Sequence, residues 1–287
     1  MIFLLLSIIA STLIFIIFKS FTKHNVNTLQ AIIVNYFIAC STGIFNSDVP
    51  VSIPAILNEE WFFGALFLGF LFISIFNVMA LTAQRNGLSV ASVASKMSVI
   101  IPVIFGLYVY NESAGWLKII GIILALVAVY LTSVKGKSSH FTLKGLWLPI
   151  VLFFGSGILD TTLKFLETSY VSKNGIPIFS ATIFFIAGSI GVLTICIKAI
   201  KTGFHFSYKS VIGGIILGIV NYYSIYLLLK ALQFEGFESS TIFTINNVAV
   251  VMLTTLLGLS IFKEKLHTKN WIGIAIAIVS IILVSLS

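Results

Sequence analysis

The sequence predicts an all-α polytopic membrane protein with ten transmembrane helices, and its composition is the first reason. Of its 287 residues, 59% are hydrophobic and only 9% are charged, whereas soluble domains average about 25% charged residues. A soluble protein of this length could not cover so much apolar side chain, because its surface must be solvated. A bilayer removes that requirement, so the composition favours a membrane protein over a soluble domain.

The second reason is the number and length of the apolar runs. A helix that crosses a bilayer needs about 20 apolar residues, and such runs follow one another here with only short connections. Strands are not expected, because lipid offers no partner to an open sheet edge and the runs lack the alternation of a membrane barrel. We predict helices at residues 2–18, 29–45, 61–84, 89–110, 115–134, 145–168, 176–198, 209–234, 239–262 and 268–286.

The breaks between the runs carry residues that favour turns or helix caps. Asn46-Ser47-Asp48 follows the second run, Asn86-Gly87 the third and Asn111-Glu112-Ser113 the fourth. Lys173-Asn174-Gly175 precedes the seventh run, and Pro177 stands where the first turn of a helix tolerates proline. These residue types cap helices or accept left-handed backbone angles, so each break is expected to be a real helix boundary.

The basic residues gather on one side of this predicted topology. The loops after the odd-numbered helices hold twelve lysine or arginine residues, and the opposite side holds three. The positive-inside rule then places the lysine-rich side in the cytoplasm and both chain termini outside. Arginine contributes one of the 17 basic residues, which is typical of an AT-rich bacterial genome. The predicted location is therefore a bacterial cell membrane.

A repeat relates residues 1–135 to residues 145–287, with five predicted helices in each half. Glu112 stands nine residues before the segment Gly121-Ile122-Ile123-Leu124-Ala125, and Glu264 stands nine residues before Gly273-Ile274-Ala275-Ile276-Ala277. An odd number of helices per half gives the halves opposite orientations. Inverted repeats of this kind are a recurrent architecture of secondary transporters.

Several small residues, a proline and two glutamates mark the repeat, namely Ala80, Gly87, Pro102, Glu112 and Gly121, then Ala231, Glu264 and Gly273. This series resembles the EamA-type repeat of the drug/metabolite transporter superfamily, over essentially the whole chain. The resemblance implies a ten-helix carrier in which the first four helices of each half line a central cavity. Two features depart from it. Thr254 stands where Pro102 aligns, and many members keep both termini in the cytoplasm, the reverse of the lysine count.

Charged residues inside the runs are the first candidates for a site. A lysine or aspartate at mid-membrane costs about 2.5–3.5 kcal/mol, so it needs a partner or a use. Lys96 lies in the fourth run, where Pro102 removes the backbone hydrogen bond that the Ser98 carbonyl would otherwise accept. Lys96 either faces a cavity and attracts an anionic or zwitterionic solute, or extends its long side chain to the interface.

The sixth run holds a second group of charges. Asp160, Lys164 and Glu167 are spaced by four and three residues, which places them on one helical face. Asp160 could bind a proton or a substrate amine, with Lys164 moderating its charge. The alternative is a self-neutralising group that lowers its own insertion cost and fixes helix packing, and this alternative suits Lys164 and Glu167 better.

Uncharged polar residues in the runs form a second tier. Interhelical hydrogen bonding is the default role for such residues, at about 0.6 kcal/mol each, and some of them are expected at the cavity. The candidates are Asn35, Tyr36, Asn77, Asn221, Tyr222, Asn246 and Asn247. By contrast, Glu112 and Glu264 sit at helix ends, where capping or interface pairing explains them. Gly214 and Gly218, and the Gly-x-x-x-Ala pairs of the fifth and tenth helices, are expected to allow close helix approach.

These features favour a secondary-active carrier that works by alternating access, with proton coupling as one option. Lys96 and Lys164 against Asp160 give the core one net positive charge, which favours a small anionic or zwitterionic metabolite such as an amino acid or organic acid. Its partners would be that solute and the lipid bilayer. The basic residues form no face for nucleic acid. We expect no cofactor, metal or enzymatic activity, because nucleotide-binding and hydrolase motifs are absent. The alternative class is a membrane-embedded enzyme or lipid-handling protein.

Overall fold

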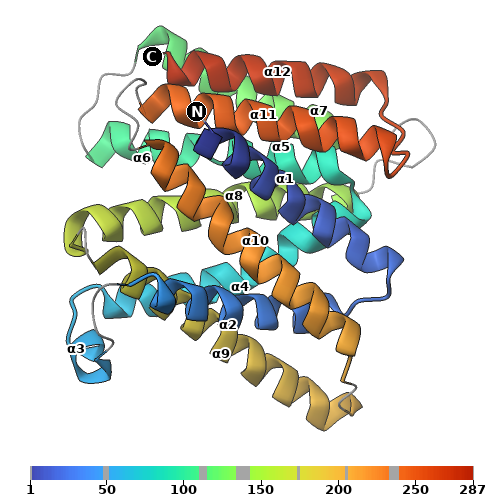
Figure 1. Cartoon of the computed structure of the whole chain (residues 1–287). Coiled ribbons are helices and arrows are strands. Elements are labelled where there is room, and N and C mark those ends of the chain that lie inside the picture. Colours follow the sequence, from blue (N-terminus) through green and yellow to red (C-terminus); the bar gives the residue numbers. More distant parts are fainter. Residues whose placement is uncertain are drawn as a thin grey trace. The chain divides into compact units, whose positions relative to one another are not determined.

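The computed structural model describes residues 2–47, 52–109, 115–133, 143–172, 175–203, 206–232 and 239–286. Within these ranges the chain forms helices joined by short connections and contains no strand (Figure 1), which confirms the predicted all-α class. The helices are α1 (Ile2–Lys23), α2 (Thr28–Phe45), α3 (Ile53–Leu57), α4 (Phe62–Arg85), α5 (Leu88–Met97), α6 (Ile100–Val109), α7 (Trp116–Ser133), α8 (Leu143–Tyr170), α9 (Ile176–Thr202), α10 (Tyr208–Leu232), α11 (Ser239–Ser260) and α12 (Thr268–Ser285).

Six helical segments in the described part of the chain are long and apolar enough to cross a membrane. They are Ile2–Lys23, Thr28–Phe45, Phe62–Arg85, Leu146–Glu167, Ile176–Ile200 and Tyr208–Leu228. Large apolar side chains project outward from these and other helices, including Phe63 at 79% exposure and Ile200 at 86%. Water would penalise such exposure and hydrocarbon would not. The chain is therefore a multi-pass helical membrane protein.

The helix boundaries differ from the predicted runs at several places. α1 continues five residues beyond residue 18, and Phe21 in this extension is buried at 3% exposure. The short helix α3 was not predicted, although Ser52 and Pro54 at its start are typical of a helix N-terminus. The run predicted at 89–110 is divided into α5 and α6 at Ser98 and Val99.

Pro102 accounts for the break between α5 and α6. Proline has no N–H, so the Ser98 carbonyl cannot receive the usual bond from four residues ahead. It accepts instead from Ile101 N at 2.9 Å, which closes a tighter turn, and the Ser98 hydroxyl donates to the Ser95 carbonyl at 2.5 Å. The predicted effect of Pro102 on this carbonyl is confirmed.

The chain forms two compact units. Unit 1 comprises Met1–Lys19, Val78–Ile158 and Tyr223–Ser287, and unit 2 comprises Ser20–Asn77 and Leu159–Tyr222. Each unit combines segments from both predicted halves, so the division into 1–135 and 145–287 stays a prediction drawn from the sequence repeat.

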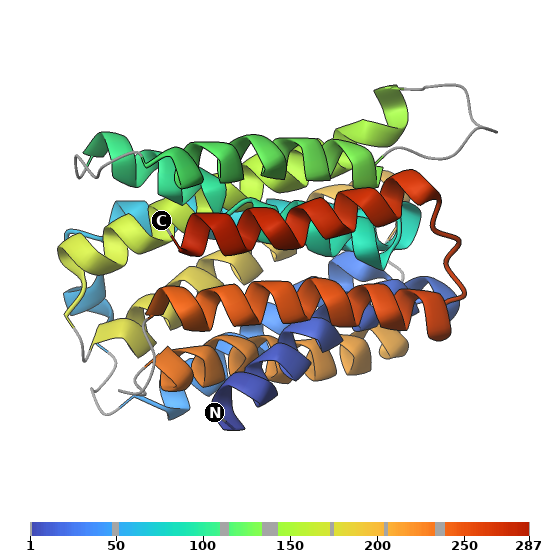
Figure 2. The same cartoon turned by 90° about the horizontal axis from the view of Figure 1, so that it is seen from above.

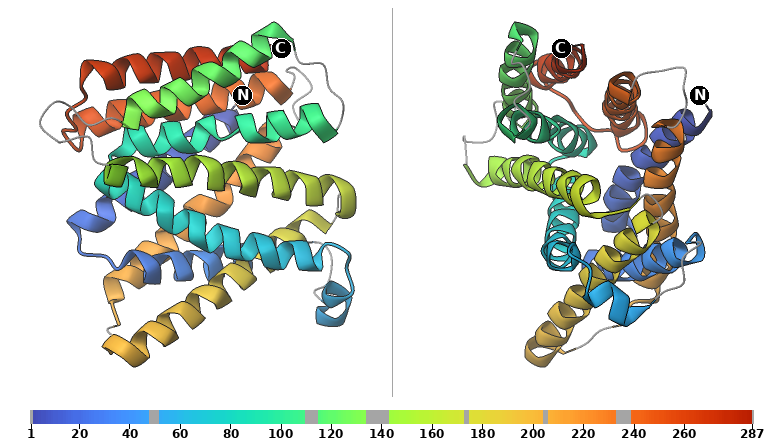
Figure 3. Two further views of the ribbon diagram at one scale, coloured as in Figure 1. Left: turned by 180° about the vertical axis from the view of Figure 1, so that it is seen from behind. Right: turned by 90° about the vertical axis from the view of Figure 1, so that its left-hand side faces the viewer.

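Unit 1 is built around the pairing of α7 with α12, which run side by side (Figures 2 and 3). A Cβ atom at Gly273 would lie 2.9 Å from the backbone nitrogen of Thr132, so only glycine allows this approach. The Ser280 hydroxyl donates to the Gly121 carbonyl at 2.7 Å, and the Asn270 amide donates to the Thr132 carbonyl at 2.9 Å. Val93, Met97, Phe153 and Val251 belong to the apolar cluster beneath this pair.

Unit 2 joins α2 to α9 and to α10. A Cβ at Gly214 would lie 2.5 Å from the Ala31 carbonyl oxygen, and one at Gly218 would lie 2.8 Å from that of Asn35. Backbone oxygens cannot move aside without moving the whole helix, so both glycines are required by the close contact. The expected role of Gly214 and Gly218, and of Gly273 in unit 1, is confirmed.

Candidate functional site

The pairing of α5 with α11 positions the most informative polar residues of unit 1. The Thr254 hydroxyl donates to the Ser92 hydroxyl oxygen at 2.7 Å. A Cβ atom at Gly258 would lie 3.6 Å from Leu88 Cβ. The step from Leu88 to Ser92 runs forward along α5, whereas the matching step from Gly258 to Thr254 runs backward along α11. The two helices are therefore antiparallel.

This register relates Lys96, near the helix break, to Asn246 on α11. One further turn along α5 brings Lys96 level with Val250, which is one turn from Asn246 along α11. The offset between Lys96 and Asn246 is therefore about 6 Å along the helix axis, at 1.5 Å per residue. Asn247, also on α11, is buried at 8% exposure.

Asn246 has an unusual environment for a membrane helix. Its side chain is 1% exposed, and among the described residues no donor lies within hydrogen-bonding distance of its Oδ1 atom. The Ser89 hydroxyl oxygen, on the same face of α5 as Ser92, is likewise buried without a partner in the described part of the chain. A buried polar group without a partner costs about 1–3 kcal/mol, so these two positions are the candidates for polar contacts beyond the described part of the chain.

Lys96 lies in the last turn of α5 and is half-buried. It is eight residues from the start of α5, which is about 12 Å along the axis. Lys96 and Ser92 are four residues apart and share one helical face, and Ser92 contacts α11. Lys96 therefore lies on the side of α5 that is turned toward α11.

The other seven predicted site residues belong to unit 2, and three of them join helices there. The Asn221 amide donates to Asn35 Oδ1 at 3.2 Å, and both side chains are buried. The Tyr36 hydroxyl donates to the Phe72 carbonyl at 2.7 Å, and its ring stacks on Phe184. These bonds connect α2 with α10 and α4, which is the default role of polar residues in membrane helices.

The remaining residues of unit 2 are less enclosed. Asn77 is half-buried and donates to the Ile73 carbonyl of its own helix at 2.7 Å, and Tyr222 is half-buried. Asp160 and Lys164 are exposed along α8, while Glu167 is half-buried. Unit 2 thus brings Asn35 and Asn221 together and leaves Asp160 and Lys164 exposed.

Glu264 caps a helix, as predicted, but the helix belongs to another part of the chain. Its carboxylate accepts from the backbone N of Leu88, the first residue of α5, at 2.9 and 3.2 Å. In the turn after α11, Lys263 has a positive φ of 50°. The chain reverses there, so that the backbone N–H of Glu264 donates to the Gly258 carbonyl. The partner of the carboxylate is Lys19, at 3.3 Å, and not a neighbouring lysine. Glu112 lies outside the described residues.

Sequence reasoning missed Thr254, Ser89 and Lys19 as parts of polar clusters. In the sequence, Thr254 differs from its surroundings only in replacing the aligned proline. Lys19 is one of the basic residues in the loops after the odd-numbered helices. Hydroxyl groups in membrane helices usually bond to their own backbone, as Thr254 also does to the Val250 carbonyl. No local signal distinguishes the few that reach another helix.

Comparison with known proteins adds evidence on the fold. No protein-family model matches the sequence. A Haemophilus influenzae protein described as uncharacterized is 29% identical over an alignment of 287 positions, which covers 97% of this chain and 95% of that protein. A crystal structure of another protein matches 98% of this chain and 97% of its own, with a TM-score of 0.57 and 11% identity. At that identity the likeness concerns the helical fold alone.

Proposed function

We propose that this protein is a secondary-active carrier of a small anionic or zwitterionic metabolite, such as an amino acid or organic acid, in a bacterial cell membrane. The observations that carry the proposal are the break between α5 and α6, which follows Lys96 by two residues, and the buried Asn246 on the neighbouring helix α11, whose Oδ1 lacks a donor among the described residues. In secondary carriers, solute sites form where a membrane helix is interrupted near the middle of the bilayer.

Helix pairing supports the inverted repeat of EamA type that the proposal includes. Within unit 2, α2 packs on α9, the second helices of the two predicted halves. Within unit 1, α7 packs on α12, the fifth helices of those halves. A two-fold relation between the halves brings equivalent elements together in this manner. Four shorter apolar helices, added to the six long spans, give the ten membrane helices of the proposal.

The chemistry of the site supports the proposed class of solute. An ammonium group in a poorly hydrated place attracts a carboxylate or another anion, because the charge is weakly screened there. The Asn246 Oδ1 atom accepts a hydrogen bond, so it suits an amine or hydroxyl on the same solute. A small molecule that carries an anionic group beside a hydrogen-bond donor meets both needs.

A ligand screen by thermal shift tests the proposal, since binding to the folded state raises its stability by mass action. The purified protein in detergent is screened against amino acids, organic acids and cationic amines of similar size. We expect an anionic or zwitterionic compound to stabilise the wild type, and Lys96→Met to weaken its binding at least tenfold. Lys23→Met, which removes an exposed lysine near the end of α1, serves as the matched control. Stabilisation by cationic amines alone, or equal binding by both variants, would refute the proposal.

A further inference from the structure

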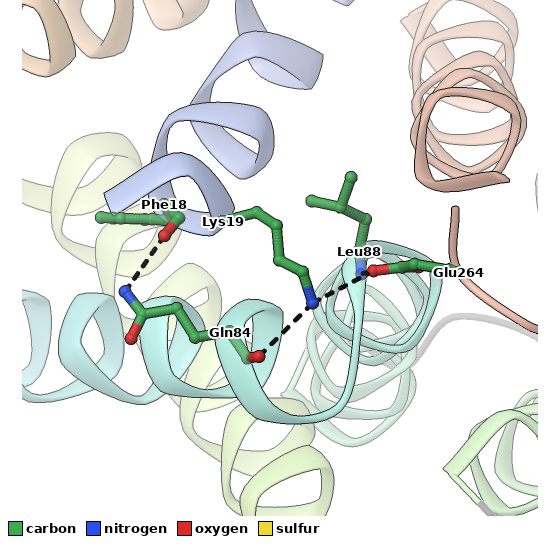
Figure 4. A network of polar contacts seen from close by, with 5 residues as sticks. All are labelled: Phe18, Lys19, Gln84, Leu88 and Glu264. Carbon is green, nitrogen blue, oxygen red and sulfur yellow. Dashed lines mark hydrogen bonds and ion pairs between the residues drawn. The ribbon is translucent and has the colours of Figure 1, made fainter. Parts of the chain in front are cut away.

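A chain of polar contacts in unit 1 joins the ends of several helices (Figure 4). The Lys19 ammonium lies 3.3 Å from Glu264 Oε1 and donates to the Gln84 carbonyl at 3.3 Å. The Gln84 side chain donates in turn to the Phe18 carbonyl at 3.0 Å. Together with the bond from Leu88 N to Glu264, these contacts link α1, the end of α4, the start of α5 and the segment after α11.

Lys19 and Glu264 each face the end of a helix whose partial charge is opposite to their own. Leu88 N is one of the first N–H groups of α5, which have no partner inside the helix and carry partial positive charge. The Gln84 carbonyl is one of the last of α4, where the helix dipole is negative. The pair is also enclosed, with side-chain exposures of 21% for Lys19 and 12% for Glu264, so solvent screens it less than a surface pair.

Two glycines make room for the Glu264 carboxylate. A Cβ atom at Gly258 would lie 2.7 Å from Oε2, and one at Gly87 would lie 3.0 Å from both carboxylate oxygens. Gly87 also has a φ of 108°, which side chains rarely adopt. The carboxylate therefore sits where any larger residue at either position would displace it.

The helix held by this carboxylate is short and can turn at both ends. α5 spans ten residues, from Leu88 next to Gly87 to Met97 next to the break at Ser98 and Val99. Glycine at a positive φ and an interrupted helical backbone are both places where large changes in backbone angle occur. Lys96 is the last residue but one of this segment.

We propose that the Lys19–Glu264 pair is a latch, and that its opening releases the N-terminal end of α5 so that α5 swings about the Ser98–Val99 break. The role of this movement in solute transport rests on the proposed function, whereas the movement itself does not. The latch predicts that α5 opens as a local unit, at a lower free energy than the helices around it.

Hydrogen exchange measured by mass spectrometry, in nanodiscs without any solute, tests the latch. Glu264→Gln removes the charge, and Gly258→Ala displaces the carboxylate while keeping the charge. We expect each to speed exchange of the amides of residues 88–97 at least tenfold, with little change in α7 and α12. Gly115→Ala is the control for the second variant, because a Cβ there meets no atom of the described residues within 4 Å. Unchanged exchange in α5, or an equal increase in all helices, would overturn the proposal.

A charge reversal separates the latch from a generic ion pair. The double variant Lys19→Glu with Glu264→Lys restores opposite charges, but it sets each against a helix end of like sign. We expect exchange in α5 to stay fast in this double variant. Recovery of the wild-type rate would contradict the helix-end geometry on which the latch depends. Neither experiment requires that a solute be known, so failure of the carrier proposal leaves both results interpretable.

Discussion

Gly218→Ala is the substitution whose effect follows most directly from the structure. The added Cβ would lie 2.7 Å from Ile38 Cβ and 2.8 Å from the Asn35 carbonyl oxygen. Ordinary contact begins at 3.4 Å, so α10 would have to move from α2 by about 0.6 Å, the difference between 3.4 and 2.8 Å. The Asn35 oxygen is backbone, so no side-chain rotation can relieve the clash.

The expected loss of stability combines three contributions. Forcing an extra carbon into a packed seam costs about 1–3 kcal/mol. The same movement stretches the bond from Asn221 to Asn35, now 3.2 Å, beyond hydrogen-bonding range, at about 0.6 kcal/mol. Replacing glycine by alanine within a helix stabilises the helix by about 0.5–1 kcal/mol, which offsets part of this loss. The net loss is about 1–3 kcal/mol.

Reversible unfolding in mixed micelles, as a function of denaturing detergent, measures this loss. Gly115→Ala is the matched control, because it adds the same atom where no part of the chain that the structure describes lies within 4 Å. We expect Gly218→Ala to unfold at clearly lower denaturing-detergent content and the control to match the wild type. Equal stability of the two variants would refute the close contact between α2 and α10.

Two further predictions concern polar groups. In a double-mutant cycle with Asn35→Leu and Asn221→Leu, we expect a coupling energy of about 0.6 kcal/mol, the mean for such bonds in membrane helices; zero coupling would mean that the bond of 3.2 Å contributes nothing. Pro102→Ala supplies an N–H for the Ser98 carbonyl, so we expect α5 and α6 to join and the amides at residues 99–102 to exchange more slowly. Exchange as fast as in the wild type would show that Pro102 does not cause the break.

The features predicted well from sequence are those that local chemistry determines. A bilayer demands long apolar runs and internal backbone hydrogen bonds, so the positions of the helices follow from hydrophobicity alone. The lost hydrogen bond at the Ser98 carbonyl follows from the missing N–H of Pro102, although the division of residues 89–110 into two helices was not predicted. The close contacts at Gly214 and Gly218 follow from a missing Cβ. None of these conclusions needs knowledge of which helices are neighbours.

The polar clusters could not be predicted in the same way, because their members are distant in sequence. Asn35 and Asn221 are 186 positions apart, and Lys19 pairs with Glu264 although two lysines stand directly beside that glutamate. The sequence offers several possible partners for each of these side chains and does not distinguish them. Which partner is contacted depends on how the helices pack. For the same reason, the axial offset of about one helical turn between Lys96 and Asn246 follows from the register that the Ser92–Thr254 bond sets.

Solute counterflow is the most direct test of the carrier proposal. Proteoliposomes are loaded with an unlabelled compound found in the thermal-shift screen, and uptake of its labelled form is followed over time. We predict transient, saturable accumulation with the wild type and with Lys23→Met, and at least a tenfold lower initial rate with Lys96→Met. Flux that does not saturate, or a wild-type rate with Lys96→Met, would contradict a carrier whose solute site includes the end of α5.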